Sequence, residues 1–139
     1  MLVKEVMTKN VVTIEKDKTV FDASNMYRDY KIGCLIVTDN KKVVGIITER
    51  DIIERTICAH LNPENTKVSE IMSTNMKKIH SLDTLDEAIK IMFENKVKKL
   101  PVMVNDEIVG IITVTDISRA RPDLSKRFME TWVRSAWVD

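Results

Sequence analysis

The segment Val44-Gly45-Ile46-Ile47-Thr48 returns as Val109-Gly110-Ile111-Ile112-Thr113. In both places an aspartate stands three residues after the threonine, so the signature Gly-x-x-Thr-x-x-Asp occurs twice. Outward from it, the two halves align without a gap over 3–52 and 68–117. A repeat of this length predicts one structural unit written twice in the chain.

Each copy has the hydrophobic periodicity of a short α/β unit. In the second copy, apolar residues at helical spacing predict an amphipathic helix over 84–96, and the first copy matches it. Two β-branched runs separated by a polar turn follow the helix and predict a hairpin. These runs are 34–38 with 43–48, and 100–104 with 107–113. With a short strand at 11–14 or 76–79 and a second helix from Thr48 or Thr113, each copy is predicted to be β-α-β-β-α.

The fold class that follows is α+β. A three-stranded sheet leaves an apolar face partly uncovered, so we expect the two copies to pack about a pseudo-twofold axis. The predicted domains are 1–62 and 63–121, joined by the turn-rich Asn62-Pro63-Glu64-Asn65, with a C-terminal helical tail at 122–139.

The composition excludes several classes of protein. The 139 residues carry a formal net charge of +1 and are 44% hydrophobic, which is typical of a globular domain. No overall field attracts a polyanion, so nucleic-acid binding is disfavoured. No apolar run is long enough to span a membrane, and we expect a cytoplasmic protein. Cys34 and Cys58 lack metal-ligand spacing and are interpreted as buried thiols.

Signatures of catalysis are absent from the sequence. It contains neither a Gly-x-x-x-x-Gly-Lys-Ser/Thr nor a Gly-x-Gly-x-x-Gly phosphate loop, and no His-Glu-x-x-His or Gly-x-Ser-x-Gly motif. His60 and His80 stand alone. We therefore expect no catalytic residues, no metal and no cofactor, and a protein that is not an enzyme.

These features together resemble the CBS domain pair, also called a Bateman module. The resemblance rests on the tandem β-α-β-β-α order, on both Gly-x-x-Thr-x-x-Asp signatures, and on the openings Val3–Thr8 and Val68–Ser73 with their Val-x-x-h-Met pattern, where h is hydrophobic. It covers about 3–120. One departure is Ile36, which stands where the second copy has the family's proline at Pro101. The two potential sites therefore need not bind equally.

The resemblance implies a regulatory module that binds an adenosine derivative such as AMP, ADP, ATP or S-adenosylmethionine. It implies that each cleft between the two CBS domains combines residues of both copies. One site would combine Val12 and Ile32 with Thr113 and Asp116; the other would combine Lys77 and Val97 with Thr48 and Asp51. Lys98 and Lys99 match positions of basic phosphate ligands, and Arg50 lies inside its motif. Their counterparts Gly33, Cys34 and Thr115 are uncharged, so we expect the two sites to differ in polyphosphate preference.

The residue types suit such a ligand. A carboxylate at a helix start can accept both ribose hydroxyls, and the threonine turn offers N–H and hydroxyl donors to a phosphate. Valine and isoleucine side chains suit a flat adenine. The alternative is that Thr-x-x-Asp is only a capping box that stabilises the helix, and both roles can coexist.

The tail has a helical pattern of its own over 124–137, formed by Leu124, Phe128, Trp132 and Ala136, with Trp137 beside them. This apolar face can pack on its own copy, on a second subunit or on another protein. We favour a contact between subunits of a homodimer, with the tail available to a regulated partner. The rival interpretation of the whole chain is a structural dimerisation or protein-interaction module whose clefts stay empty.

Overall fold

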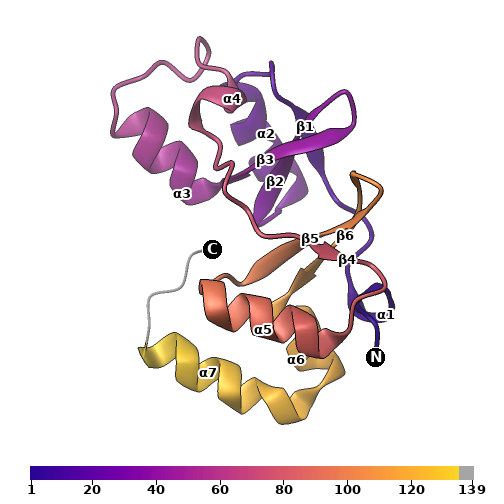
Figure 1. Ribbon diagram of the computed structural model, residues 1–139. Helices are drawn as coiled ribbons and strands as arrows, with labels where there is room; N and C mark the ends of the chain where they lie inside the picture. The colour runs from indigo at the N-terminus through magenta and orange to yellow at the C-terminus, as the bar shows by residue number, and fades with distance from the viewer. Residues whose placement is uncertain (135–139) are drawn as a thin grey trace. The chain divides into compact units, whose positions relative to one another are not determined.

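The structure, a computed structural model, describes residues 1–134 of the chain. It contains two three-stranded sheets with the orders β1-β2-β3 and β4-β5-β6 (Figure 1). The first sheet consists of β1 (Thr13–Glu15), β2 (Cys34–Asp39) and β3 (Lys42–Thr48). The second consists of β4 (Ile79–His80), β5 (Lys99–Val104) and β6 (Glu107–Thr113). The predicted α+β class and the repeat of one unit are confirmed.

Strand pairing is the same in both sheets. The first strand runs parallel to the second, which pairs antiparallel with the third. The first strands begin later than predicted, at Thr13 and Ile79. Val12 still accepts a hydrogen bond from the Ile36 N–H at 3.3 Å, so this residue continues the pairing just outside the strand.

The hairpin turns use two residues with positive φ. These are Asn40 and Lys41 in the first hairpin (φ 50° and 73°) and Asn105 and Asp106 in the second (φ 49° and 68°). Two consecutive left-handed residues are the geometry of a type I′ turn, whose twist matches that of the flanking strands. The polar turns of the sequence are therefore tight hairpin connections.

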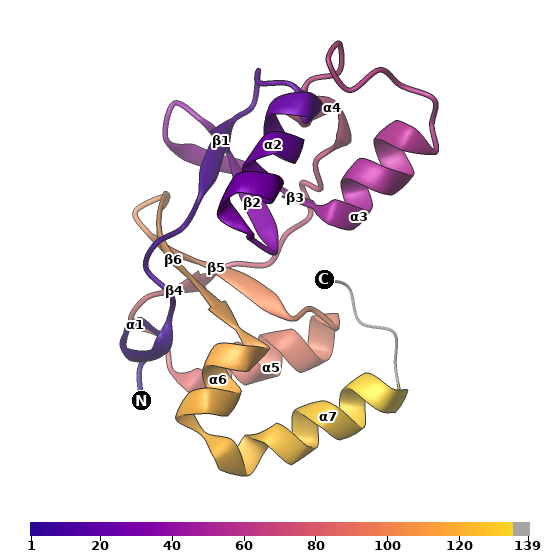
Figure 2. The ribbon, with the colours of Figure 1, turned by 180° about the vertical axis from the view of Figure 1, so that it is seen from behind.

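In each sheet, a long helix connects the first strand to the second along the chain. These are α2 (Val20–Tyr30), which lies against the first sheet in Figure 2, and α5 (Leu85–Asn95). Thr19 and Thr84 cap their starts, and both helices end in a left-handed lysine. The predicted helix over 84–96 is confirmed, because its apolar face is buried in a core with the strands.

A second helix begins directly after each hairpin, as predicted. In the first copy it is α3 (Glu49–Ile52), continued by the π-helical turn η1 (Ile53–Ile57). In the second copy it is the regular α6 (Val114–Ala120). Short helices that were not predicted, α1 (Val3–Val6) and α4 (Val68–Ile71), open the copies. Four residues are too few to produce a recognisable helical period.

The chain divides into two compact units that exchange their opening segments. Val11–Met76 forms one, here called the first-sheet unit. Met1–Asn10 and the chain from Lys77 onward form the other, the second-sheet unit. Accordingly, Ser73 pairs with Ile46 in the first-sheet unit, and Thr8 pairs with Ile111 in the second. The predicted domains follow the sequence repeat, whereas the compact units cut across it at both openings.

The absence of a side chain at the signature glycines allows these exchanged segments to pack closely against β3 and β6. A Cβ on Gly45 would lie 2.5 Å from Met72 Sδ, and one on Gly110 would lie 2.6 Å from Met7 Sδ and 2.9 Å from the Thr8 carbonyl oxygen. Both glycines also face a register shift in the hairpin. The glycines therefore serve close backbone approach as well as the bend of the strand.

The tail continues from η2 (Pro122–Leu124) into α7 (Ser125–Arg134), which lies beside α5 and α6 (Figures 1 and 2). Phe128 is 1% exposed and stacks on Phe93 of α5, with ring centroids 5.1 Å apart. Leu124 also packs against this core. The predicted subunit contact is therefore wrong for Phe128, because α5 of the same chain already covers it, whereas Leu124 is only partly buried. Ala136, Trp137 and the side chain of Trp132 lie outside what the structure describes.

Candidate functional site

Each signature threonine and aspartate form a reciprocal capping box. Thr48 Oγ1 accepts from the Asp51 N–H at 3.2 Å, and the Thr48 N–H donates to Asp51 Oδ2 at 3.0 Å. The same pair of bonds joins Thr113 and Asp116 at 3.1 and 3.0 Å. The helix-cap interpretation is therefore confirmed in both copies. Each box occupies one carboxylate oxygen, and an ionised carboxylate has about four acceptor positions.

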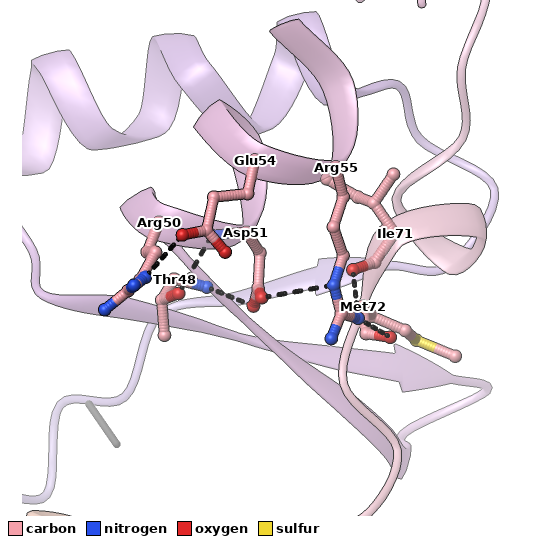
Figure 3. Close-up of polar contacts among 7 residues, drawn as sticks. All are labelled: Thr48, Arg50, Asp51, Glu54, Arg55, Ile71 and Met72. Carbon is pink, nitrogen blue, oxygen red and sulfur yellow. Dashed lines mark hydrogen bonds and ion pairs between the residues drawn. The ribbon is translucent and has the colours of Figure 1, made fainter. Parts of the chain in front are cut away.

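The second oxygen of each carboxylate meets a different group. Asp116 Oδ1 accepts from the Thr8 hydroxyl at 3.2 Å, and Asp116 is 9% exposed. Asp51 Oδ1 lies 3.7 Å from Arg55 Nε in an ion pair (Figure 3), and 14% of the Asp51 side chain is exposed. A neutral donor faces one signature carboxylate and a cation faces the other.

The first turns of the two helices also differ in charge. α3 carries Glu49 and Asp51, whereas α6 carries only Asp116. Because an acidic side chain already complements the positive end of the helix, the additional carboxylate of Glu49 disfavours a phosphate there. The start of α6 is the less acidic of the two.

The predicted adenine walls lie at the edges of the two cores. Val12 and Ile32 are partly buried against the core of the first-sheet unit, and Val97 against that of the second. Their apolar side chains are held in place by packing, so each offers an ordered apolar surface.

The basic residues proposed for phosphate have specific neighbours. Lys98 and Lys99 are half-buried at the start of β5, and the Lys98 carbonyl accepts from the Val114 N–H at 2.9 Å. Lys77 is exposed. Arg50 Nε lies 2.7 Å from Glu54 Oε1, so a ligand phosphate would compete with that carboxylate for the guanidinium (Figure 3).

The compact units divide the predicted site residues into two sets. The first-sheet unit holds Val12, Ile32, Thr48, Arg50 and Asp51, and the second-sheet unit holds Lys77, Val97, Lys98, Lys99, Thr113 and Asp116. Each predicted site takes residues from both sets, and this combination stays a prediction.

Sequence reasoning missed two residues that contact the signature carboxylates. Thr8 is separated from Asp116 by 108 residues, so no local pattern connects them. Arg55 stands four residues after Asp51, which is the spacing of neighbours on one helix face. The i,i+4 spacing is enough to predict the contact of Arg55 with Asp51 from the sequence. The contact of Thr8 with Asp116 can be recognised only in the folded structure.

Tyr27 of α2 is hydrogen-bonded to the backbone next to the first signature threonine. Its hydroxyl donates to the Ile47 carbonyl at 2.6 Å, one residue before Thr48. Burial raises the pKa of Tyr27 well above its usual range, and electrostatic interactions with Cys34, Glu49 and Asp51 add to the shift. The phenol therefore remains protonated and holds β3 against α2 at any physiological pH.

The described residues 1–134 contain neither a candidate metal cluster nor a helix able to span a membrane. No cluster of three or more histidine, cysteine, aspartate or glutamate residues within this range could hold a metal ion. None of the helices in the same range has the length and apolar character needed to cross a bilayer.

The sequence matches the CBS domain family twice, at residues 3–57 and 68–123. A CBS domain-containing protein of Bacillus subtilis, YhcV, is 29% identical over 84% of this chain and 82% of its own length. The inosine-5'-monophosphate dehydrogenase of Methanocaldococcus jannaschii is 37% identical over 84% of this chain, which spans only 23% of that enzyme.

Solved structures agree with the family match. The crystal structure of Hypoxic Response Protein I with two coordinated zinc ions has a TM-score of 0.78 and 26% identity, and the match covers 86% of this chain and 98% of that one. The two family matches lie on the two repeats that carry the capping boxes and the signature glycines. The chain belongs to the CBS domain family and contains two CBS domains in tandem.

Proposed function

We propose that this chain is a regulatory module that binds an adenosine derivative, such as AMP, ADP, ATP or S-adenosylmethionine, through its signature threonines and aspartates. Tandem CBS domains are known in general as regulatory modules that bind adenosine ligands. In this proposal the chain catalyses no reaction; ligand binding changes its conformation and a partner protein reads that change.

One observation carries the proposal. Each signature aspartate uses one oxygen in its capping box, and the other oxygen accepts from or pairs with a side chain that a ligand can displace. A ribose diol offers two hydroxyl donors that can replace the Thr8 hydroxyl on Asp116 as charge-assisted bonds. The capping role and the binding role are compatible, because they use different oxygens.

Calorimetric titration with AMP, ATP and S-adenosylmethionine tests the proposal. Asp116→Asn should lower affinity at one site by tenfold or more, about 1.4 kcal/mol, because a neutral amide accepts the diol less strongly. Asp22→Asn is the matched control, since Asp22 forms the same capping box with Thr19 outside the signature. It should weaken helix α2 and leave affinity unchanged. Absence of heat with all three ligands would favour the rival interaction module.

A homodimer is part of the same proposal. Ile53 and Ile57 are 52% and 60% exposed and stand one helical turn apart, and Leu61, which follows them, is 45% exposed. Apolar side chains gathered on one helix are typical of an interaction surface. Ile57→Asp should shift the molar mass measured by light scattering from dimer to monomer, and Leu82→Asp, at a 57% exposed leucine of the other unit, should not. A monomeric wild type would refute the dimer and leave ligand binding to be judged by calorimetry.

A further inference from the structure

Arg55 forms an ion pair with the first signature carboxylate, and its guanidinium is also hydrogen-bonded to two backbone carbonyls. Its Nε is 3.7 Å from Asp51 Oδ1, and its Nη1 donates to the carbonyl oxygens of Ile71 at 3.1 Å and Met72 at 3.4 Å. Figure 3 shows the guanidinium between the helix that carries Asp51 and the segment that carries the two carbonyls. All four residues belong to the first-sheet unit.

The second copy has no such cation at the matching position. Ala120 aligns with Arg55, and the Thr8 hydroxyl bonds to Asp116 instead. A hydroxyl is neutral and rotates freely, so it can leave the carboxylate or turn towards a new partner. A guanidinium held by two carbonyls cannot turn away without losing those bonds.

This difference bears on how each aspartate accepts a ribose. A diol binds a carboxylate through charge-assisted bonds, whose strength depends on the negative charge that the carboxylate presents. Arg55 offsets that charge and competes for the same oxygen. Half of the Arg55 side chain is exposed, at 52%, so solvent screens the pair and the competition is moderate.

We propose that Arg55 is a specificity-determining residue that competes with the ribose for Asp51 and makes the first signature the weaker of two unequal adenosine sites. This inference rests on the proposed function and adds the cause of the asymmetry. Asp116 then binds first as ligand concentration rises, and Asp51 responds only at higher concentration.

Calorimetric titration of the whole chain with AMP tests the proposal. Asp51→Asn and Asp116→Asn assign each binding transition to its aspartate. Arg55→Ala, which gives the first copy the residue of the second, should raise the affinity of the Asp51 transition about three- to fivefold, as expected for removal of a partly exposed ion pair. The Asp116 transition should not change.

Two further variants control for charge and folding. Arg28→Ala removes one positive charge from the same unit, where Arg28 pairs with exposed Asp29, and should change neither transition. Arg55→Gln keeps a donor for the Met72 carbonyl but no charge, so it should raise the Asp51 affinity even if Arg55→Ala unfolds the unit.

The outcomes separate this inference from the proposed function. An unchanged or lower affinity of the Asp51 transition in Arg55→Gln overturns the inference, and a lower value would mean that Arg55 contacts the phosphate of AMP. Equal affinities of the two transitions in the wild type also overturn it. Absence of AMP binding, together with absence of binding by ATP and S-adenosylmethionine, refutes the proposed function and the inference with it.

Discussion

The first-sheet and second-sheet units share the same order of strands and helices, but they differ in which side chains pack over their helices. In the second-sheet unit, α7 places Phe128 on Phe93. In the first-sheet unit, Arg28 of α2 stands at the position that matches Phe93. The π-helical turn η1 of the same unit leaves Ile53 and Ile57 exposed. The duplicated elements retained their caps, turns and close glycine contacts, whereas outward-facing side chains diverged. A duplicated fold can therefore be covered by its own tail in one half and leave apolar helix side chains exposed in the other.

The interiors of the two units differ in one supporting contact. Tyr27 hydrogen-bonds to the Ile47 carbonyl, whereas its counterpart Met92 is fully buried in an apolar core. Met92 contributes only packing, while Tyr27 adds a bond to the backbone beside Thr48. The start of the first signature is thus tied to α2 by a polar contact, whereas Met92 of α5 gives the second signature no such hydrogen bond.

The largest expected effect comes from breaking the tail contact. Phe128→Ala should lower the free energy of unfolding by about 3–5 kcal/mol, because it empties a fully buried site under α7. Urea denaturation with hydrogen exchange on α5 measures the loss. Phe21→Ala is the control, at a phenylalanine of α2 that is 46% exposed, and should cost much less, about 0.5 kcal/mol. Equal losses would mean that the two units do not differ in how their helices are covered.

A second comparison uses the signature glycines. Gly110→Ala should cost about 2–3 kcal/mol, because its Cβ would lie 2.9 Å from the Thr8 carbonyl oxygen, which cannot move without the backbone. Gly45→Ala should cost about 1–2 kcal/mol, because its closest contact is the flexible Met72 side chain and the Ser73 carbonyl oxygen is 3.1 Å away. Chemical denaturation gives both values.

Removal of the methionines sharpens this comparison. Met72→Ala should relieve most of the additional strain of Gly45→Ala in the double variant, since only a side chain is displaced. Met7→Ala should relieve less of the strain of Gly110→Ala, because the backbone contact remains. The opposite order would indicate that the opening segments adjust their backbones equally in both units.

The smallest effect concerns a buried hydroxyl that only the first copy has. Thr56 of η1 is fully buried, and its Oγ1 has no hydrogen-bond partner among the described residues, whereas its counterpart Arg121 pairs with Asp123. Thr56→Val keeps the shape and removes the unsatisfied group, so it should stabilise the chain by about 1 kcal/mol in urea denaturation. Thr66→Val is the matched control and should destabilise by about 1 kcal/mol, because Thr66 donates to the Asn62 carbonyl at 2.8 Å. Loss of stability in both variants would mean that Thr56 is satisfied in solution.

The sequence was sufficient for features set by neighbouring residues. The caps at Thr48 and Thr113 join atoms three residues apart, and the hairpin turns need only two residues with positive φ. The spacing of apolar residues likewise predicted α5, since a helix has a regular period. The four-residue opening helices escaped prediction because they are shorter than that period can reveal.

The sequence by itself therefore determined the repeat, the order of the elements and both capping boxes, because hydrogen bonds and periodicity over a few residues depend on local chain geometry. Only the tertiary structure decided that the opening segments are exchanged, that Thr8 reaches Asp116 across 108 residues, and that Arg55 binds the carbonyls of the second opening. Those contacts join segments far apart in the chain, and they form only after the sheets and helices have packed. No spacing in the sequence encodes them, because their distances are set by the packed core and not by the chain between them.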